Sequence, residues 1–481
     1  MTMIDFQSIL PQLTPGVQVE TDWTGGRTGL GVDEKKLLLL GHKTSAGSAA
    51  LGAVQSITSR AQAILLFGAG SDLACMCETA LSIAPMSPIF AVAYAEGTTA
   101  ATGTVAFTGT SATAPGAAVI TIGGRRFQVG IAKTDTPTII GAALVALITA
   151  HPNCPVTAVN TTGSVALTHS TKGTHGNSVL TSGTCTAPGI TLTITQLANG
   201  ATDGTPATTL AGVEGDRYHL VAHNLQDIVT VPLLVTDREK QSGVAVQKWG
   251  MGIVGCTGTR GTAETLQGTS GVHSYRLQLV WLNGCQRPCY ELAAAFAALR
   301  ATKAANVSLD DLTLAGFAPA LNETLWPNAA EIEAALRSGL TPLRPLRDGT
   351  VQVVRSIVAQ TQASSPYLID HMPIEISDYA DENLIRTLTL RAKGKRLKSG
   401  SPAGSPGTMT PQRINAIANE VFYLLDKNDY LQGVQDAVKA GLDFTVINSI
   451  DPNRTDTAMR FWPIAFAHFC AVKKNYVTSA G

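Results

Sequence analysis

The sequence predicts a multidomain α/β protein, and three observations carry that prediction. The chain has 481 residues, whereas a single hydrophobic core stops growing at about 250 to 300 residues. Apolar runs typical of buried strands alternate with helical patterns in two separate stretches, as in a parallel α/β sheet. Between those stretches lies a segment rich in threonine and glycine that is almost free of charge. We therefore expect one α/β domain that a smaller β-rich module interrupts.

The two α/β stretches cover residues 32–96 and 205–361. The first opens with the strand pattern KKLLLLG. The second contains the strand patterns RYHLVAHN, GMGIVGC and YRLQLVWL and the helical pattern CYELAAAFAALRATKA. Strands that are buried on both faces have nearly continuous apolar runs, so these patterns predict a parallel sheet covered by helices.

The inserted module is expected at residues 97–204, which hold 25 threonines and only six charged side chains. Short runs of alternating polarity, such as AAVITIGG and SVALTHS, predict strands separated by Gly and Thr turns. One apolar stretch, IIGAALVALITA, predicts a single helix among them. The module would replace a loop of the α/β domain.

A small α+β domain is expected at residues 362–469. PYLIDHMPIEISD predicts a strand, and NLIRTLTLRAKG predicts a helix or a strand. Thr410 is then placed to cap a helix that has Pro411 at its first position. The apolar stripe expected on that helix is Ile414, Ile417, Val421 and Leu424.

Two terminal arms complete the chain, at residues 1–31 and 470–481. Within the first arm, LTPGVQVETDW alternates apolar and polar side chains, which is a strand pattern. A glycine-rich stretch follows it directly, so no hairpin partner lies beside it in the sequence. Because backbone polar groups must find partners, this strand has to pair with a distant segment, in this chain or in another copy.

Composition excludes several classes of protein. The 35 basic residues balance the 35 acidic ones, so no net field draws the chain to nucleic acid. Only 15% of the residues are charged, which favours a surface covered by further copies. We expect neither a signal peptide nor membrane insertion, because the apolar runs are far shorter than the roughly 18 residues that span a bilayer. The eight cysteines have no metal or redox spacing and are expected to be buried free thiols.

Two stretches resemble nucleotide-binding loops without meeting their requirements. LLFGAGSDLACM looks like a strand, a glycine turn and a helix, but Leu73 follows Gly68 and Gly70 where a dinucleotide loop needs its third glycine. LLLLGHKTSAG resembles the end of a phosphate loop, but His42 interrupts it. No HExxH or GxSxG motif is present. We expect no catalytic, cofactor or metal site, although a scattered Ser, His and Asp triad stays open.

The order of these segments resembles the contractile tail sheath proteins of Mu-like bacteriophages. The resemblance rests on the TPGVQVE arm, LLLLGHKTSAGSA, FGAGSDLACM, a β-rich insertion with the turn KGTHGN, and the terminal INSIDPNRTDTAMRFWPIAFAHFCAV. It covers essentially the whole chain. It implies a subtilisin-like main domain, which names a fold and not a protease, with no cofactor and with the inserted module on the outer surface.

The resemblance also implies which segments contact neighbouring subunits. In such sheaths both terminal arms leave their own subunit and add strands to the small C-terminal domain of neighbouring copies. The residues expected in the N-terminal arm are Pro15, Gly16, Val17, Val19, Thr21 and Trp23. Those expected in the C-terminal arm are Cys470, Val472, Lys473, Lys474, Tyr476 and Val477. A flexible linker of Gly25, Gly26, Gly29 and Gly31 would absorb domain motion.

The function that the resemblance implies is contraction of a phage tail. Hexameric rings of the chain would assemble in the host cytoplasm, stack around the tail tube in the virion, and shorten from a metastable extended state. The expected partners are further copies, the tail tube protein, and the baseplate and tail terminator proteins. Two alternatives stay open, an α/β hydrolase or nucleotide-binding enzyme and a non-contractile structural polymer.

A run of basic residues in the C-terminal part also invites a functional interpretation. Its members are Arg391, Lys393, Lys395, Arg396 and Lys398. The run fits a tube-facing or interlayer patch that grips an acidic partner surface. It also fits a solvated flank of a loop, which is the more common role of such runs.

Overall fold

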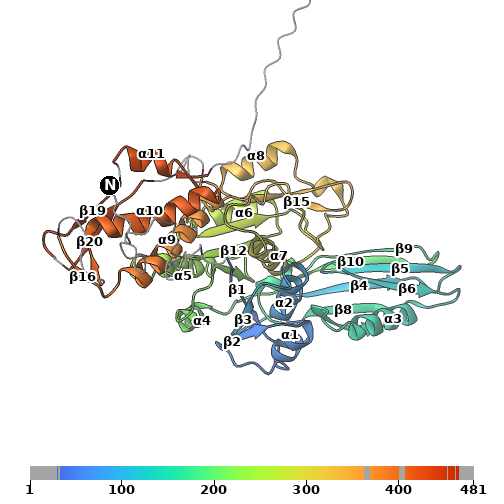
Figure 1. Cartoon of the computed structure of the whole chain (residues 1–481). Coiled ribbons are helices and arrows are strands. Elements are labelled where there is room, and N and C mark those ends of the chain that lie inside the picture. The colour runs from blue at the N-terminus through green and yellow to red at the C-terminus, as the bar shows by residue number, and fades with distance from the viewer. Residues whose placement is uncertain are drawn as a thin grey trace, which may run out of the picture. The chain divides into compact units, whose positions relative to one another are not determined.

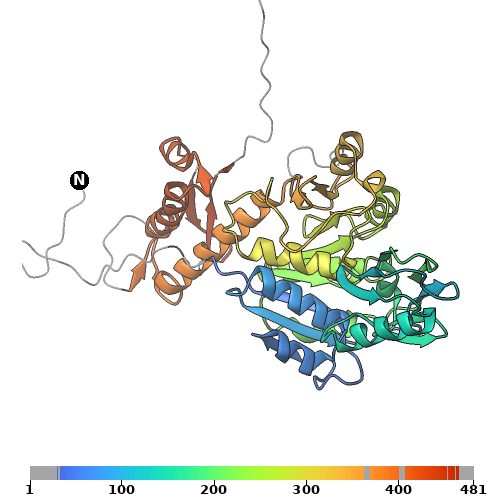
Figure 2. The ribbon, with the colours of Figure 1, turned by 90° about the vertical axis from the view of Figure 1, so that its right-hand side faces the viewer.

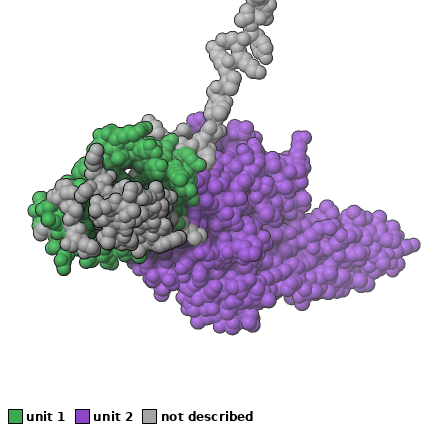
Figure 3. Space-filling model, in the orientation of Figure 1, with its two compact units in different colours: residues 1–32, 379–464 green, residues 33–378, 465–481 purple. Residues whose placement is uncertain are grey.

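The computed structural model describes residues 30, 33–361, 369–399, 407–441, 443–451, 453–460 and 462–464. The chain divides into two compact units, distinguished by colour in Figure 3. We call Asp33–Asp378 the α/β unit and Tyr379–Ile464 the C-terminal unit.

The α/β unit is built on an eight-stranded sheet of order β15-β14-β13-β12-β11-β1-β3-β2. Its strands are β1 Leu37–His42, β2 Val54–Ile57, β3 Ile89–Tyr94, β11 Leu220–His223, β12 Met251–Cys256, β13 Leu277–Trp281, β14 Thr341–Pro345 and β15 Val351–Val353. The strands from β3 to β14 are parallel, and β2 and β15 add antiparallel edges. The predicted parallel sheet is thus confirmed at all four strand patterns.

Helices cover both faces of this sheet. One face carries α1 Arg60–Phe67, α2 Asp72–Ile83 and α7 Cys289–Ala301, and the other carries α4 Ala207–Val213, α5 Val231–Ser242, α6 Arg260–Gln267 and α8 Ala329–Arg337. Figure 2 shows α2 and α7 side by side over the sheet. Leu37 and Leu39 enter the first core, and Leu38 and Leu40 enter the second. Each of these fully buried side chains stabilises the fold by about 1.5–3 kcal/mol.

The threonine-rich segment forms two antiparallel sheets and one helix between β3 and β11 (Figure 1). Its elements are β4 Thr102–Thr108, β5 Gly116–Ile122, β6 Arg125–Ile131, α3 Pro137–Ala150, β7 Val156–Thr161, β8 Ser164–His169, η1 Thr174–Ser178, β9 Thr181–Cys185 and β10 Thr191–Ala198. The sheets, β10-β4-β8-β7 and β6-β5-β9, enclose a core of their own. The single predicted helix is confirmed as α3, whereas an independent domain at residues 97–204 stays a prediction.

The two ends of this module meet. The backbones of Thr99 and Ala201 form an antiparallel bridge with a hydrogen bond in each direction, both 3.3 Å long. The Thr98 N–H donates to the carbonyl of Thr202 at 3.1 Å. The chain therefore leaves the α/β domain and returns to it at nearly the same point.

The sequence interpretation of LLFGAGSDLACM as strand, turn and helix was wrong in its first part. Its opening residues end helix α1, whose N-cap Ser59 accepts a hydrogen bond from the Gln62 N–H. A short apolar run does not distinguish a buried strand from a helix, and the upstream cap decided here. Gly68 and Gly70 follow with φ values of 84° and 73° and turn the chain into α2.

The C-terminal unit consists mainly of helices with short strand pairs. The elements after β15 are α9 His371–Arg391, β16 Arg396–Leu397, β17 Thr408–Met409, α10 Pro411–Lys427, β18 Leu431–Gln432, α11 Val434–Lys439, β19 Phe444–Ile447, β20 Thr455–Ala458 and β21 Trp462–Pro463. The boundary between the two units falls within α9.

Helix α9 corrects the strand predicted for PYLIDHMPIEISD, insofar as the structure describes that stretch. It also settles the helix-or-strand choice for NLIRTLTLRAKG, which lies largely in the same helix. The buried residues of α9 recur every three or four positions, as on one face of a helix. They include Ile376, Ala380, Asn383 and Thr387.

Helix α10 begins as predicted. The Thr410 hydroxyl accepts a hydrogen bond from the Arg413 N–H at 3.3 Å, and Pro411 occupies the first turn. Ile414 and Val421 are buried, whereas the other two residues of the predicted stripe are half-buried. None of the helices in the described part of the chain combines the length and the apolar character that crossing a bilayer requires.

Candidate functional site

Polar side chains gather at the carboxyl edge of the parallel sheet. His42 ends β1, Tyr94 ends β3, and His223 ends β11, with Asn224 next to it. All four side chains are buried. The strand order turns back beside β1, and in open α/β sheets ligands bind at the carboxyl ends of the strands at such a point. This edge is therefore the expected position of a ligand-binding or catalytic site.

Asp72 is the charged centre of this cluster. It follows the N-cap Ser71 at the start of α2, where a helix stabilises negative charge. The His42 N–H donates to both carboxylate oxygens at 3.2 and 3.0 Å, and Asn224 Nδ2 donates to Oδ2 at 2.5 Å. Burial alone would raise the pKa of the Asp72 carboxyl, but His42 and His175, with the hydrogen bonds from His42, hold it well below its usual range. Asp72 is thus a buried carboxylate.

The turn of the inserted module between β8 and β9 covers the cluster. Thr171 Oγ1 donates to Asp72 Oδ1 at 3.2 Å and lies 2.8 Å from His175 Nε2. The ring of His175 packs against that of His42 with centroids 4.7 Å apart and against that of His169 at 4.8 Å. Burial lowers the pKa of His175 and of His169. Three segments that are distant in sequence thus share one polar centre.

This centre has the residue types of a catalytic pair but not the access. His42 and Asp72 are both fully buried, and the neighbouring Cys289 is 1% exposed. Burial raises the pKa of the Cys289 thiol to about 12, so it is not a thiolate nucleophile near neutral pH. Within the described residues, the geometry supports a structural role for the cluster.

A buried ionic cluster also joins the module to the α/β domain. The Glu291 carboxylate on α7 accepts hydrogen bonds from Arg125 Nη1 at 2.8 Å and from Arg287 Nη1 at 2.9 Å. Arg125 belongs to strand β6 of the module, so this ion pair crosses between the two parts. Glu291 is fully buried, whereas the side chains of Arg125 and Arg287 are 11% and 30% exposed.

The predicted basic run is divided by the structure. Arg391, at the end of α9, forms an ion pair with Glu420 of α10 at 2.5 Å. The other four members, Lys393, Lys395, Arg396 and Lys398, are exposed on and around β16. Because Arg391 already has an acidic partner in its own unit, the exposed basic patch consists of the other four residues. Their role as a contact surface stays a prediction.

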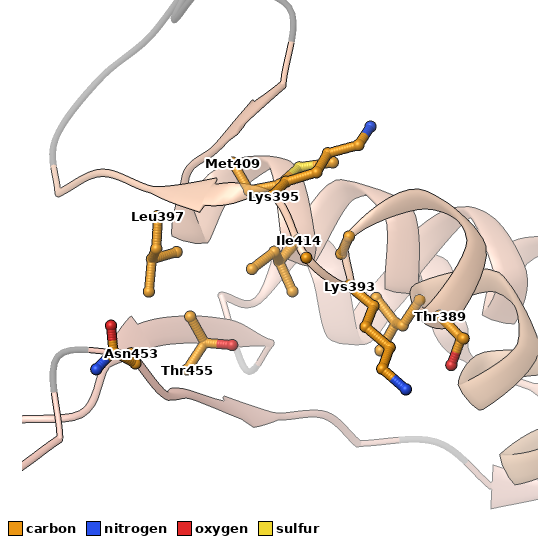
Figure 4. A pocket seen from close by; sticks show the side chains of 11 residues that line it. Thr389, Lys393, Lys395, Leu397, Met409, Ile414, Asn453 and Thr455 are labelled. Carbon is orange, nitrogen blue, oxygen red and sulfur yellow. The ribbon is translucent and has the colours of Figure 1, made fainter.

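A groove of about 330 Å³ lies beside this patch, within the C-terminal unit. Figure 4 shows Leu397 and Ile414 on one side of it and Asn453 and Thr455 on the other. Lys393 and Lys395 line it as well. The groove thus lies between the β16–β17 pair and the β19–β20 hairpin and is lined by apolar, polar and basic residues.

The β19–β20 hairpin is joined by no third strand in the part of the chain that the structure describes. Among the described residues its two strands pair only with each other, from Phe444 opposite Ala458 to Ile447 opposite Thr455. Helix α10 packs against β19, yet Phe444 and Val446 are 54% and 48% exposed. An isolated two-stranded hairpin is marginally stable in water. Its open edges and half-exposed apolar face are suited to further strands.

Both predicted arms lie outside the described residues. The N-terminal set is Pro15, Gly16, Val17, Val19, Thr21 and Trp23, and the C-terminal set is Cys470, Val472, Lys473, Lys474, Tyr476 and Val477. Their pairing stays a prediction. The seven described cysteines are free thiols and six of them are buried, as predicted.

The buried cluster was not among the predicted sites, although the sequence contains a signal for part of it. KKLLLLGH, FAVAY and HLVAHN are apolar strands that each end in a polar side chain or a tyrosine. In a parallel sheet these ends meet at one edge. In the sequence, His42 interrupts a phosphate-loop pattern, and His175 lies in the KGTHGN turn, which carries no such signal.

The α/β unit thus contains a polar centre closed to solvent, and the C-terminal unit contains a hairpin that pairs with no other strand among the described residues. The tail sheath protein of the Mu-like prophage FluMu from Haemophilus influenzae is 29% identical to this chain over 310 residues. The match covers 62% of this chain and 62% of that relative, so it spans less than two thirds of the relative's length. It confirms the resemblance to Mu-like tail sheath proteins that the order of the motifs indicated. No family model matches the chain.

Solved structures of sheath proteins give weaker similarity. Sheath tail proteins from Desulfitobacterium hafniense and Listeria innocua each give a TM-score of 0.49 at 13% identity, covering 93% and 89% of this chain and 100% and 92% of theirs. The contracted helical sheath of the anti-feeding prophage gives 0.49 at 11% identity, covering 96% of this chain and 98% of its own.

Proposed function

We propose that this chain is the subunit of a contractile phage tail sheath. Hexameric rings of it stack around the tail tube and contract from a metastable extended state, which drives the tube through the host envelope. The similarity to the Mu-like prophage tail sheath protein carries this proposal. The shortage of charged residues, 15% of the chain, supports a surface that is largely covered by other copies.

In this proposal the β19–β20 hairpin accepts the terminal arms of neighbouring subunits. Strand addition satisfies the backbone groups of an open edge and covers apolar side chains on the sheet face. The exposed Phe444 and Val446 on β19 support such an acceptor. Strands donated in this way tether subunits while their domains move as rigid bodies, because a glycine-rich linker absorbs the motion.

The α/β unit is the rigid body that moves during contraction. Its doubly covered sheet supports this assignment, because packed cores transmit displacement instead of deforming. We assign it a subtilisin-like topology without protease chemistry and place the module of residues 97–204 on the outside of the sheath. The tube, baseplate and terminator proteins are its further partners, in a virion assembled in the host cytoplasm.

Deletion of residues 1–24 tests the arm mechanism directly. The deletion removes the strand pattern at 13–23 but no residue of the described sheet or of α10. The truncated chain should remain soluble, with a circular dichroism spectrum and melting temperature close to those of the unassembled full-length chain. It should form no tubes by negative-stain electron microscopy, whereas the full chain should form hollow, striated tubes.

Point variants refine this test. Val17→Pro removes a backbone donor within the strand pattern and should reduce tube formation. Ser8→Pro, which lies upstream of the pattern, is the matched control and should assemble normally. If truncated chains still polymerise into sheath-like tubes, the donated-strand mechanism is wrong. If the full chain forms only discrete particles, the sheath function itself is wrong.

A further inference from the structure

The buried cluster at the carboxyl edge of the sheet has the donor set of a metal site. His42, Asp72 and His175 each offer a ligand atom, and these atoms all lie within 4.8 Å of one another. All three side chains are at most 1% exposed. Two imidazoles and a carboxylate are the ligands with which proteins commonly bind zinc, and three protein ligands leave a fourth position for a hydroxyl group or water.

The hydrogen-bond pattern of the cluster is incomplete at its histidines. His42 Nε2 and His175 Nδ1 have no hydrogen-bond partner among the described residues. Buried polar atoms are nearly always paired, and those that lack a protein partner point to a water or an ion. The two unpaired nitrogens belong to the two imidazoles that face each other across the cluster.

The charge balance of the cluster points the same way. No lysine or arginine of the described chain forms an ion pair with the Asp72 carboxylate, whose only ionic contact is His42 Nδ1 at 3.1 Å. Buried charges in proteins are paired or coordinate metals. Other buried carboxylates of the same unit follow this rule, since Glu291 has two arginines and Asp237 has Arg238.

Asn224 positions two of the proposed ligands by hydrogen bonds. The Tyr94 hydroxyl donates to Asn224 Oδ1 at 2.5 Å, so the Asn224 amide nitrogen faces the cluster. That nitrogen lies 2.9 Å from His42 Nδ1 and 2.5 Å from Asp72 Oδ2. Asn224 thus lies between the imidazole of His42 and the carboxylate of Asp72 and orients both, as outer-shell partners of metal ligands do.

We propose that His42, Asp72 and His175 bind one divalent transition-metal ion of the zinc class. Imidazole ligands favour zinc and its neighbours over magnesium or calcium, which prefer oxygen ligands alone. Thr171 Oγ1, 2.8 Å from His175 Nε2 and 3.2 Å from Asp72 Oδ1, either completes the ligand set or orients it. The site is structural, because it is closed to solvent.

The ion would fasten the inserted module to the α/β domain. His42 and Asp72 come from β1 and α2, whereas His175 comes from the turn of the module between β8 and β9. A shared ion therefore ties the module to the sheet edge at one defined point. This inference does not depend on the sheath function, since it uses only contacts within the α/β unit.

The test is the metal content of the full-length chain. The protein is expressed in medium supplemented with Zn²⁺ and purified without chelators or a metal-affinity tag. Elemental mass spectrometry should then find about one zinc per chain. Protein grown with Co²⁺ should show the visible absorption bands of low-symmetry cobalt, a signal that nonspecific surface binding does not give. Prolonged dialysis against a chelator should lower the melting temperature.

Isosteric variants locate the ion. His175→Gln and Asp72→Asn should reduce the zinc content at least tenfold and remove the cobalt bands. His223→Gln is the matched control, because His223 is equally buried at the end of the adjacent strand but lies outside the ligand set, and it should retain both signals. A wild-type chain with less than about one zinc per ten chains would overturn the proposal, even if both variants were insoluble. Equal metal content in wild type and soluble His175→Gln would overturn it too.

Discussion

Replacement of Glu291 by glutamine should destabilise the α/β unit strongly, because it leaves two arginines facing a neutral group. Glu291 is fully buried and is the acidic partner of both Arg125 and Arg287. The amide of glutamine still accepts one hydrogen bond, but it carries no charge. The substitution therefore removes the ion pair that joins β6 of the module to α7.

The size of the effect follows from the exposure of the two arginines. Removal of one partner of a buried ion pair costs about 3–5 kcal/mol, because the other charge is left uncompensated. Arg287 is 30% exposed and can turn towards water, whereas Arg125 is only 11% exposed. We therefore expect about 3 kcal/mol for Glu291→Gln, roughly a hundredfold in the folding equilibrium. Arg125→Met should cost about 1–2 kcal/mol, because Glu291 keeps Arg287.

Equilibrium urea unfolding provides the assay. Three of the five tryptophans, Trp249, Trp281 and Trp326, belong to the α/β unit, and Trp281 is buried in its sheet, so tryptophan fluorescence reports mainly on that unit. Far-ultraviolet circular dichroism follows the whole chain. The double variant Arg125→Met, Glu291→Gln completes a thermodynamic cycle. Its cost should be lower than the sum of the single costs by about 1–2 kcal/mol, since the buried arginine is gone.

Two results would refute this reasoning. A cost below about 1 kcal/mol for Glu291→Gln would mean that water reaches the cluster and screens it, as at exposed ion pairs. Additive costs in the cycle would mean that Arg125 and Glu291 do not stabilise each other, and the ion pair would then not hold the module to α7.

Three further outcomes are expected. Gly70→Ala should lower the free energy of unfolding by at least about 1 kcal/mol more than Gly349→Ala. Both glycines have positive φ, 73° and 84°, but only at Gly70 would an added Cβ meet a backbone oxygen, at 2.1 Å. Equal costs in urea unfolding would contradict the turn geometry. The free energy of unfolding of the α/β unit should fall as the pH is lowered from 6.5 to 4, because burial lowers the pKa of both His219 and His371 to about 3. In this range the unfolded chain binds protons that the folded chain does not, which costs about 1.4 kcal/mol per pH unit for each histidine. A melting temperature that is constant over this range would contradict the prediction. Val446→Lys should change the stability of the unassembled chain by less than about 0.5 kcal/mol and yet prevent tube formation, and normal tubes by electron microscopy would argue against the hairpin as an acceptor.

The sheet could be predicted from the sequence because its strands are unusually apolar. Residues 37–40 are four consecutive leucines, all fully buried, and such a run fits a strand covered on both faces. Helix α9 could not be recognised in the same way. Its first turns contain Pro373 and alternate apolar and polar residues from Ile374 to Ser377, which imitates a strand, and the helical spacing shows only over a longer window.

The contribution of the inserted module to the buried cluster could not be predicted, because only tertiary structure brings His175 to the edge of the sheet. His42 and His175 are more than a hundred residues apart, and a pattern within one segment cannot show that two segments meet. The KGTHGN turn has the composition of an ordinary surface loop. Its histidine is nevertheless buried, because the turn closes over the edge of the sheet.

The bridge between Thr99 and Ala201 has a consequence for how the chain can fold. Leu40 on β1 pairs with His223 on β11, about 180 residues further along, so sheet formation requires a long loop to close. A module that folds first and joins its own ends at Thr99 and Ala201 shortens that loop to about 80 residues of free chain. Each halving of a loop lowers the entropic cost of closing it by only about 0.6 kcal/mol, so the free energy of forming the sheet depends little on the length of the inserted module. The distance between the ends of the insertion, and not its length, then determines which replacement modules this fold can carry.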